Sequence, residues 1–179
     1  RDFRLLYIGQ VVSFLGNMIS YVAVPYQVYD LTKNNAVVGA IGIAQLVPVL
    51  IFGILGGTFA DRLNRRRLLI NSEILMALLM VGILINSLLP TPSVPATLLI
   101  VTLRQAVRVF HRPAMEAWTQ TIIPKEDYAA IGALNGFRYA FGAIAGPAIA
   151  GSIIAGLGVR VAFGIDVLTF VGAIWCLWL

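Results

Sequence analysis

Long uninterrupted apolar runs are the feature of this 179-residue sequence that most restricts its fold. Each run is close to, or somewhat longer than, the roughly 20 residues that a helix needs to cross a bilayer. The runs cover residues 3–29, 36–60, 68–89, 96–118, 128–157 and 160–179. Only 12% of the residues are charged, about half the fraction that is typical of a water-soluble domain. We therefore expect six transmembrane helices and no separate soluble domain.

The breaks between the runs carry turn-forming residues. They lie at residues 30–35, 61–67, 90–95, 124–127 and 156–160. β-Strands are not expected, because the runs are continuous rather than alternating, and backbone groups in lipid must be paired within a helix or a closed barrel. The sequence thus predicts one all-α membrane domain over residues 1–179. Because the chain begins at Arg1 and ends inside an apolar run, we expect it to be a fragment of a longer protein.

The Lys and Arg residues in the breaks predict the orientation of the chain, because cytoplasmic loops are enriched in them. With a cytoplasmic N-terminus, that side carries seven of these residues and the other side carries two, Lys33 and Arg160. The seven are Arg1, Arg4, Arg62, Arg65, Arg66, Arg67 and Lys125. We expect both ends in the cytoplasm. No basic patch interleaved with aromatic residues predicts a nucleic-acid partner.

Ionisable residues inside the apolar runs are costly in lipid, so they must face protein partners or a water-filled cavity. In the fourth run, Arg104, Arg108 and Arg112 are spaced by four, and His111 falls on the same face. One interpretation is a polar central cavity for a solute or a proton, lined by Asn17, Gln27, Gln45, Arg104, Arg108, Arg138 and Asp166. The alternative is a set of buried ion pairs that fix the helix register, with Arg112 reaching the cytoplasmic interface.

Proton coupling would need a protonatable carboxylate inside the bilayer. Asp166 is the acid that lies well inside an apolar run, and Glu73 lies about a turn and a half into the third run. Asp166 is therefore our choice for the proton carrier, against the alternative that it is only an ion-pair partner. Histidine is the residue type that changes charge near neutral pH, which makes His111 an alternative, but a lone histidine at a helix end is more often an interfacial hydrogen-bonding group.

Small residues form a stripe along the fifth run. The segment reads Gly142-Ala-Ile-Ala-Gly146-Pro147-Ala-Ile-Ala-Gly151, so that Gly142, Gly146 and Ala150 are spaced by four. Such a flat face allows a neighbouring helix to approach closely, and Pro147 is expected to kink its own helix. Ordinary tight packing inside a helix bundle is also compatible with this spacing.

The break between the second and third runs carries a specific motif. It reads Gly57-Thr-Phe-Ala-Asp61-Arg62-Leu-Asn64-Arg65-Arg66-Arg67-Leu68-Leu69. This stretch resembles the signature loop of the major facilitator superfamily, Gly-x-Leu-Ala-Asp-Arg-x-Gly-Arg-Lys-x-x-Leu. Phe59, Asn64 and Arg66 replace a Leu, a Gly and a Lys of that pattern. Asn64 suits the loop because it tolerates the left-handed conformation that we expect in this turn.

Two further stretches support the resemblance. Residues 142–151 resemble the fifth-helix motif Gly-x-x-x-Gly-Pro-x-x-Gly-Gly of exporters in this superfamily, with Ala150 where the first of two final glycines is usual. Residues 112–135 resemble the branch that contains macrolide and enterobactin-type siderophore efflux proteins. The resemblance covers the whole chain. It implies that the chain is the N-terminal six-helix half of a twelve-helix transporter, without the C-terminal half, and that the protein lies in the inner (plasma) membrane of a bacterium.

The resemblance also implies roles for individual residues. A conformational-switch loop would comprise Gly57, Asp61, Arg62, Arg65, Arg66 and Glu116. In it, Asp61 would brace the outward-open state against the missing half, and Arg65 would pair with Glu116. The superfamily pattern of one midplane arginine followed by Gln-Gly is not cleanly present, so Arg104 and Arg108 remain alternatives for the arginine that takes part in proton coupling.

These features predict a secondary active transporter that exports amphiphilic small molecules against protons by alternating access. Uptake by the same fold and a non-transporting membrane scaffold are the alternatives. An enzyme is disfavoured, because the chain has one histidine, no Gly-x-Ser-x-Gly and no pair of carboxylates on one helix face. It also lacks a Gly-x-x-x-x-Gly-Lys-Ser/Thr loop for ATP. With one cysteine, Cys176, we expect no disulfide, metal or cofactor.

Overall fold

The computed structural model describes residues 2–62, 64–122 and 124–178. Within these ranges, the side chains of residues 2–6, 54–62, 65, 120, 122, 125, 177 and 178 fall outside the description. The described backbone forms six α-helices and one short 3-10 helix. They are α1 (Asp2–Thr32), α2 (Asn35–Arg62), α3 (Arg65–Leu88), α4 (Val94–Ile122), η1 (Lys125–Asp127), α5 (Tyr128–Leu157) and α6 (Val159–Trp178). The six predicted runs are thus six helices, and the all-α membrane fold is confirmed.

Five of these helices, judged on the described residues, are long and apolar enough to cross a membrane. The exception is α4, which carries Arg104, Arg108 and Arg112 within its length. These arginines lower its mean hydropathy but do not expose it, because α4 packs along both α2 and α3. Arg104 extends from α4 towards α1 and α6. The helix therefore needs protein neighbours on its charged face, which the bundle provides.

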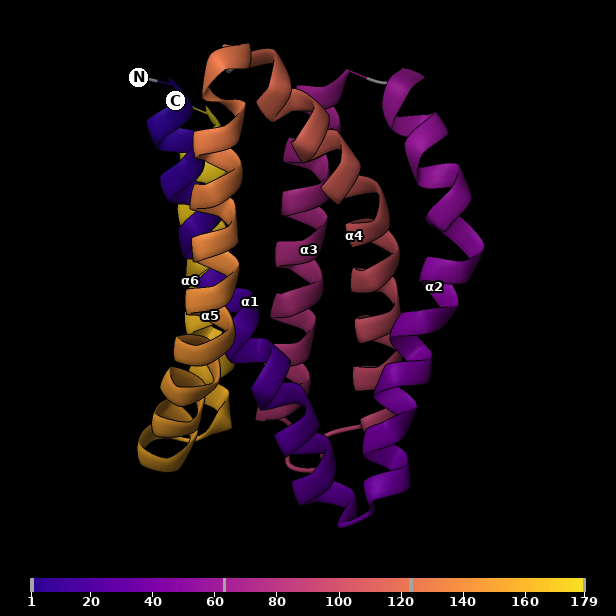
Figure 1. The fold of residues 1–179 in the computed structure, drawn as a ribbon. Helices are drawn as coiled ribbons and strands as arrows, with labels where there is room; N and C mark the ends of the chain where they lie inside the picture. The colour runs from indigo at the N-terminus through magenta and orange to yellow at the C-terminus, as the bar shows by residue number, and fades with distance from the viewer. Residues whose placement is uncertain (1, 63, 123, 179) are drawn as a thin grey trace.

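The helices form two groups of three that stand side by side (Figure 1). One group contains α1, α5 and α6, and the other contains α2, α3 and α4; contacts between α3 and α6 join them. Both termini lie at one end of the bundle, together with the α2–α3 and α4–α5 connections (Figure 1). The α1–α2 and α3–α4 connections lie at the opposite end. The chain therefore crosses the bundle an even number of times, as the sequence predicts.

The predicted small-residue stripe of α5 packs against α1. Gly142, Gly146 and Ala150 are buried. A Cβ atom added at Gly142 would collide with the ring of Phe14, and one at Gly146 would lie 2.5 Å from Cβ of Met18. Glycine at these two positions therefore allows α1 and α5 to approach closely.

The C-terminal part of the same motif does not take part in this contact. Gly151 is exposed, and a Cβ atom there would have no described neighbour within 4 Å. Pro147 is also exposed, and α5 continues through it from Tyr128 to Leu157. Close packing against α1 is thus confined to the buried face from Gly142 to Ala150.

Large apolar side chains fill the junction between the two helix groups. Phe163 and Phe170 of α6 and Met80 of α3 are completely buried there. On the outside, apolar side chains such as Leu50 and Leu168 are about 70% exposed. An apolar exterior around a buried junction suits a helix bundle that is surrounded by lipid.

The turn between α2 and α3 differs from our expectation at Asn64. Its backbone is extended, with φ −63° and ψ 108°, rather than left-handed. Its side-chain Oδ1 accepts a hydrogen bond of 3.2 Å from the backbone N–H of Arg67. Asn64 is therefore the N-cap of α3, where it satisfies one of the backbone donors that the first helical turn leaves unpaired. Capping, and not tolerance of a positive φ, explains the asparagine.

Replacing Gly146 by Val should destabilise the bundle, because the new side chain would overlap Met18. We expect a loss of about 1–3 kcal/mol in the free energy of unfolding. The loss would be measured as a lower denaturation midpoint of the full-length protein in detergent. Gly151→Val is the matched control, because the same side chain on the same helix meets no described neighbour within 4 Å. Equal losses in both variants would contradict the α1–α5 contact.

Candidate functional site

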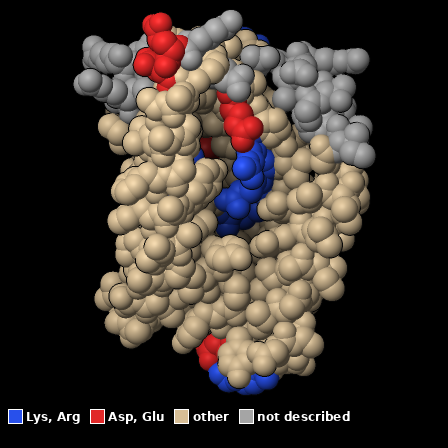
Figure 2. Space-filling view, in the orientation of Figure 1, with Lys and Arg blue, Asp and Glu red and all other residues tan. Residues whose placement is uncertain are grey.

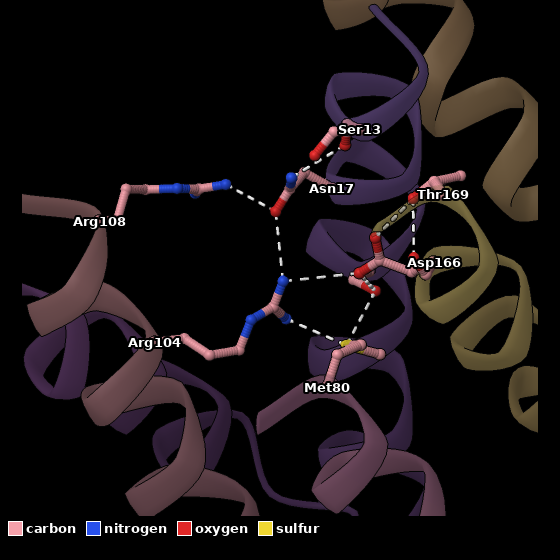
Figure 3. Close-up of polar contacts among 8 residues, drawn as sticks. Ser13, Asn17, Met80, Arg104, Arg108, Asp166 and Thr169 are labelled. Carbon is pink, nitrogen blue, oxygen red and sulfur yellow. Dashed lines mark hydrogen bonds and ion pairs between the residues drawn. The ribbon is translucent and has the colours of Figure 1, made fainter. Parts of the chain in front are cut away.

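Arg104 of α4 extends into the middle of the bundle and contacts three other helices (Figure 3). Its Nη2 lies 3.5 Å from Oδ2 of Asp166 on α6 and donates to Oδ1 of Asn17 on α1 at 3.2 Å. Its Nη1 donates to Sδ of Met80 on α3 at 3.1 Å. The guanidinium carbon also lies 5.8 Å from the ring centroid of Phe170. One side chain thus connects α4 to α1, α3 and α6.

Asp166 is completely buried, and both of its carboxylate oxygens have partners. The Ser20 hydroxyl donates to Oδ2, and the Thr169 hydroxyl lies 3.3 Å from Oδ1. A buried carboxylate requires such hydrogen bonds and an opposite charge, here Arg104. A Cβ atom at Gly16 would collide with the Thr169 side chain and lie 2.6 Å from Oδ1 of Asp166. Glycine at position 16 therefore allows α1 to approach the carboxylate.

Asn17 connects this ion pair to a second arginine. Its Nδ2 donates to the backbone carbonyl of Ser13 at 2.9 Å, which directs Oδ1 towards α4. Oδ1 accepts hydrogen bonds from Arg104 and from Arg108, whose Nη2 lies 2.6 Å away (Figure 3). A single amide oxygen therefore accepts from two guanidinium groups.

A cavity of about 600 Å³ lies between the two helix groups, towards the end of the bundle that carries the termini. Figure 2 shows basic side chains inside this hollow and acidic ones nearer its rim. α1, α3, α4 and α5 contribute lining residues, among them Gln10, Phe14, Asn17, Glu73, Met76, Arg108, His111, Arg112, Glu116, Asn135, Arg138 and Tyr139. We call this space the large cavity. Its wall combines aromatic and aliphatic groups with several charges.

A second, smaller cavity of about 230 Å³ lies between α1, α2 and α4. Gln45 and Arg104 are part of its wall. Asn17, Met76 and Arg108 line both this small cavity and the large one. These three side chains therefore lie at the boundary between the two spaces.

Two contacts between basic and acidic side chains lie in the wall of the large cavity. His111 Nε2 lies 3.1 Å from Oε1 of Glu73, close enough for an ion pair when the histidine is protonated but without the alignment of a hydrogen bond. Arg112 Nε lies 3.3 Å from Oε1 of Glu116, and both of these side chains are more than 60% exposed. Arg112 therefore lies at the exposed rim of the cavity. This position is compatible with the interpretation that its side chain reaches the cytoplasmic interface. Among the described residues, no group of three or more His, Cys, Asp or Glu side chains could hold a metal ion.

Arg138 of α5 lies in the wall of the large cavity among neutral and aromatic groups. Its Nη1 donates to Oε1 of Gln10 on α1 at 2.8 Å. Its guanidinium carbon lies 5.2–5.8 Å from the ring centroids of Tyr7, Phe14 and Tyr139. Its Nε is buried and has no hydrogen-bond partner among the described atoms. The aromatic rings stabilise the cation by their quadrupoles without neutralising its charge.

Most of the residues that we expected in a central cavity line one of the two spaces. They are Asn17, Gln45, Arg104, Arg108 and Arg138. Asp166, which we also expected there, is not among the lining residues of either cavity. Because α6 packs against α1 and α3, its carboxylate is buried behind the cavity walls. Gln27 is buried and is not among the lining residues of either cavity, and its Oε1 has no described hydrogen-bond partner.

The expected switch loop lies largely outside the described side chains. This applies to Gly57, Asp61, Arg62 and Arg65. The expected contact between Arg65 and Glu116 therefore stays a prediction. Arg66 is exposed at the start of α3. The described partner of Glu116 is Arg112.

Sequence analysis overlooked three polar residues of α1 that help to build the site. Gln10 contacts Arg138, Ser13 orients Asn17, and Ser20 donates to Asp166. A signal was available, because Gln10, Ser13, Asn17 and Ser20 recur at i, i+3, i+7 and i+10. This spacing places them on one face of a helix.

Comparison with known proteins gives one family and a set of distant relatives. The model of the transmembrane secretion effector family of the major facilitator superfamily matches residues 1–179. Enterobactin exporter EntS of Salmonella choleraesuis is 25% identical over 91% of this chain and 39% of its own length. EntS of Shigella boydii is 26% identical over 91% of this chain and 39% of its own length. Macrolide efflux protein A of Streptococcus pyogenes is 22% identical over 93% of this chain and 41% of its own length. The chain thus spans about two fifths of these relatives, and no solved structure matched it.

Removing either partner of the buried Arg104–Asp166 pair should leave an uncompensated charge. We expect Arg104→Gln and Asp166→Asn each to lower the free energy of unfolding by about 3–5 kcal/mol. The double variant should lose less than the sum of the two. Denaturant titration of the full-length protein in detergent would measure the three losses.

Arg112→Gln is the control for this cycle, because it removes an arginine from an exposed pair on the same helix. Its loss should be at most about 1 kcal/mol. Strictly additive losses in the cycle would show that Arg104 and Asp166 do not interact.

Proposed function

Because the chain belongs to the transmembrane secretion effector family of the major facilitator superfamily, we propose that it is part of a secondary active transporter that exports small amphiphilic molecules. The energy comes from the proton gradient across a bacterial plasma membrane. The two kinds of relatives are named as an exporter and an efflux protein, which favours export over uptake or a scaffold role. A second set of helices, beyond the two fifths of the relatives that this chain spans, completes the transport pathway.

The large cavity is the observation that carries this proposal. It is a space of about 600 Å³ inside a membrane helix bundle, within the usual size range of small-molecule sites. Apolar side chains such as Met76 and Phe14 line it together with Arg108 and Arg138. Such a mixed wall suits a molecule that has both apolar and polar parts.

Alternating access requires that the six helices move as a unit against their partner helices. The close packing of α1 against α5 at Gly142 and Gly146 supports such a rigid unit. The Arg104 side chain adds contacts from α4 to α1, α3 and α6. In this proposal, substrate binds in the large cavity. It leaves when the six-helix unit and its partner helices rotate against each other.

The Arg104–Asp166 pair is the proposed site of proton coupling. A proton that binds the Asp166 carboxylate removes the charge that attracts Arg104, and its release restores the pair. Arg104, and not Arg108, lies within ion-pair distance of Asp166 among the described residues. This distance supports Arg104 as the arginine that takes part. The protonation state of one buried group would thereby bias the packing of α4 against α6.

The full-length protein should reduce the accumulation of at least one fluorescent amphiphile, from a panel that includes anionic and neutral ones, in cells, and an uncoupler should abolish that effect. Asp166→Asn should also abolish it, because the residue can then no longer exchange a proton. Asp30→Asn is the control, since Asp30 is exposed and pairs with Lys33 at the far end of the bundle. Efflux that persists with an uncoupler, or in Asp166→Asn at normal expression, would contradict proton coupling.

The orientation predicted from the loop charges is part of the proposal and has its own test. In a Cys176→Ser background, a membrane-impermeant maleimide should label Asn34→Cys in intact cells but not Glu126→Cys. Both positions are exposed, in the α1–α2 and α4–α5 connections respectively. The reverse pattern would place the N-terminus outside the cytoplasm.

A further inference from the structure

The charges on the wall of the large cavity do not balance. Three arginines line it, namely Arg108, Arg112 and Arg138, against two acidic side chains, Glu73 and Glu116, and His111 adds a further positive charge only when it is protonated. Each acid already has a partner, because Glu73 lies beside His111 and Glu116 beside Arg112. Two arginines, Arg108 and Arg138, are left over. No described carboxylate lies within 4.0 Å of either guanidinium.

Asp166 makes no ion pair with Arg108 or Arg138. It lies behind the wall, where Arg104 is its ion-pair partner. Its oxygens also accept from Ser20 and contact Thr169. Because Arg104 carries one positive charge and Asp166 one negative charge, the two cancel. The surplus charge therefore belongs to the cavity itself.

The neighbours of the two arginines orient them without neutralising them. Arg108 donates to the amide oxygen of Asn17, and Arg138 donates to that of Gln10. A guanidinium has five N–H donors, and the described structure gives each of these arginines one hydrogen bond. The Nε of Arg138 is buried without a partner. Such a buried donor is costly unless an acceptor joins it, whereas Arg108 is exposed and so is accessible to a ligand in the cavity.

We propose that Arg108 and Arg138 bind the anionic group of the transported molecule, so that the substrate class is a small amphiphilic anion such as a carboxylate, a sulfonate or a phenolate. This proposal rests on the transport function proposed above and specifies its substrate. Arginine suits the role, because its planar fork can donate two parallel hydrogen bonds to one anionic group.

The remainder of the cavity wall accounts for the apolar part of that molecule. Phe14 and Tyr139 meet edge to face, with ring centroids 5.0 Å apart, and both line the cavity. Met18, Met76 and Met115 contribute flexible thioethers, which adapt to apolar groups of different shapes. The wall therefore offers aromatic and thioether surface close to the two arginines.

Two probes of the same shape test the charge preference. The first is 2-naphthoate, an anion, and the second is 2-naphthamide, its neutral isostere. Binding would be measured at equilibrium on the full-length protein in nanodiscs of phosphatidylcholine. We expect the wild-type protein to bind the anion about tenfold or more tightly than the amide. Equal affinities, or binding of neither probe, would overturn the proposal.

Variants then assign the preference to residues. Arg108→Gln and Arg138→Gln should each weaken naphthoate binding by about tenfold or more and change naphthamide binding by less than about twofold. Arg160→Gln is the matched control and should change neither, because Arg160 is exposed and is not among the lining residues of either cavity. If a Gln variant binds neither probe, the same two affinities are measured on Arg108→Lys and Arg138→Lys. These variants keep the charge and should keep the preference for the anion. Retained anion preference in the Gln variants, or its loss in both Lys variants, would overturn the proposal.

Two other sources of negative charge are distinguished by the same assay. If an anionic lipid headgroup is the natural occupant, phosphatidylglycerol in the nanodisc will compete with naphthoate, and the substrate assignment fails. If an acidic residue of the remaining helices neutralises the arginines, the wild-type protein will show no preference. Because binding is measured without transport, failure of efflux with retained anion preference would refute the proposed function alone. Efflux without anion preference would refute this inference alone.

Discussion

The buried ion pair of Arg104 and Asp166 is the interaction on which the arrangement of this bundle depends. Each charge is costly alone inside a membrane, so the bundle is more stable when α4 and α6 lie where the two side chains meet, 3.5 Å apart. Ser20 can complete the carboxylate environment only because Gly16 brings α1 close to α6. The same requirement keeps α4, which is too polar to face lipid on all sides, inside the bundle. A single electrostatic constraint thus positions three of the six helices.

α1 combines a packing role with a polar role. Phe14 and Met18 contact the glycine stripe of α5. Gln10, Asn17 and Ser20 reach charged groups of α5, α4 and α6. The helix is therefore held by close contact at Phe14 and Met18 while neighbouring positions supply neutral hydrogen-bonding groups. Neutral groups can orient arginines without cancelling their charge, which leaves that charge available to a ligand.

The helices were predictable because each apolar run is long enough to span a bilayer, and the stripe at Gly142 and Gly146 was predictable from its spacing. The position of Asp166 behind the cavity wall was not, because sequence spacing fixes a face of one helix but not the neighbour that covers it. The partner of Glu73 was hidden for the same reason, since His111 lies on another helix. The role of Asn64 was misjudged because asparagine suits both a left-handed turn and an N-cap. Tertiary packing therefore determined the surroundings of Asp166 and Glu73, and a local hydrogen bond determined the role of Asn64.

The amide of Asn17 has a consequence for how the two cavities communicate. Asn17, Met76 and Arg108 are the side chains common to both walls, and the Asn17–Arg108 hydrogen bond lies among them. The spaces are therefore divided by side chains rather than by backbone. Of the three, Arg108 is exposed, whereas Met76 is buried. Rotamer changes of exposed side chains take picoseconds to nanoseconds, whereas helix displacements take microseconds or longer. The part of the boundary that Arg108 forms can consequently adjust to the shape of a bound molecule without any helix having to move.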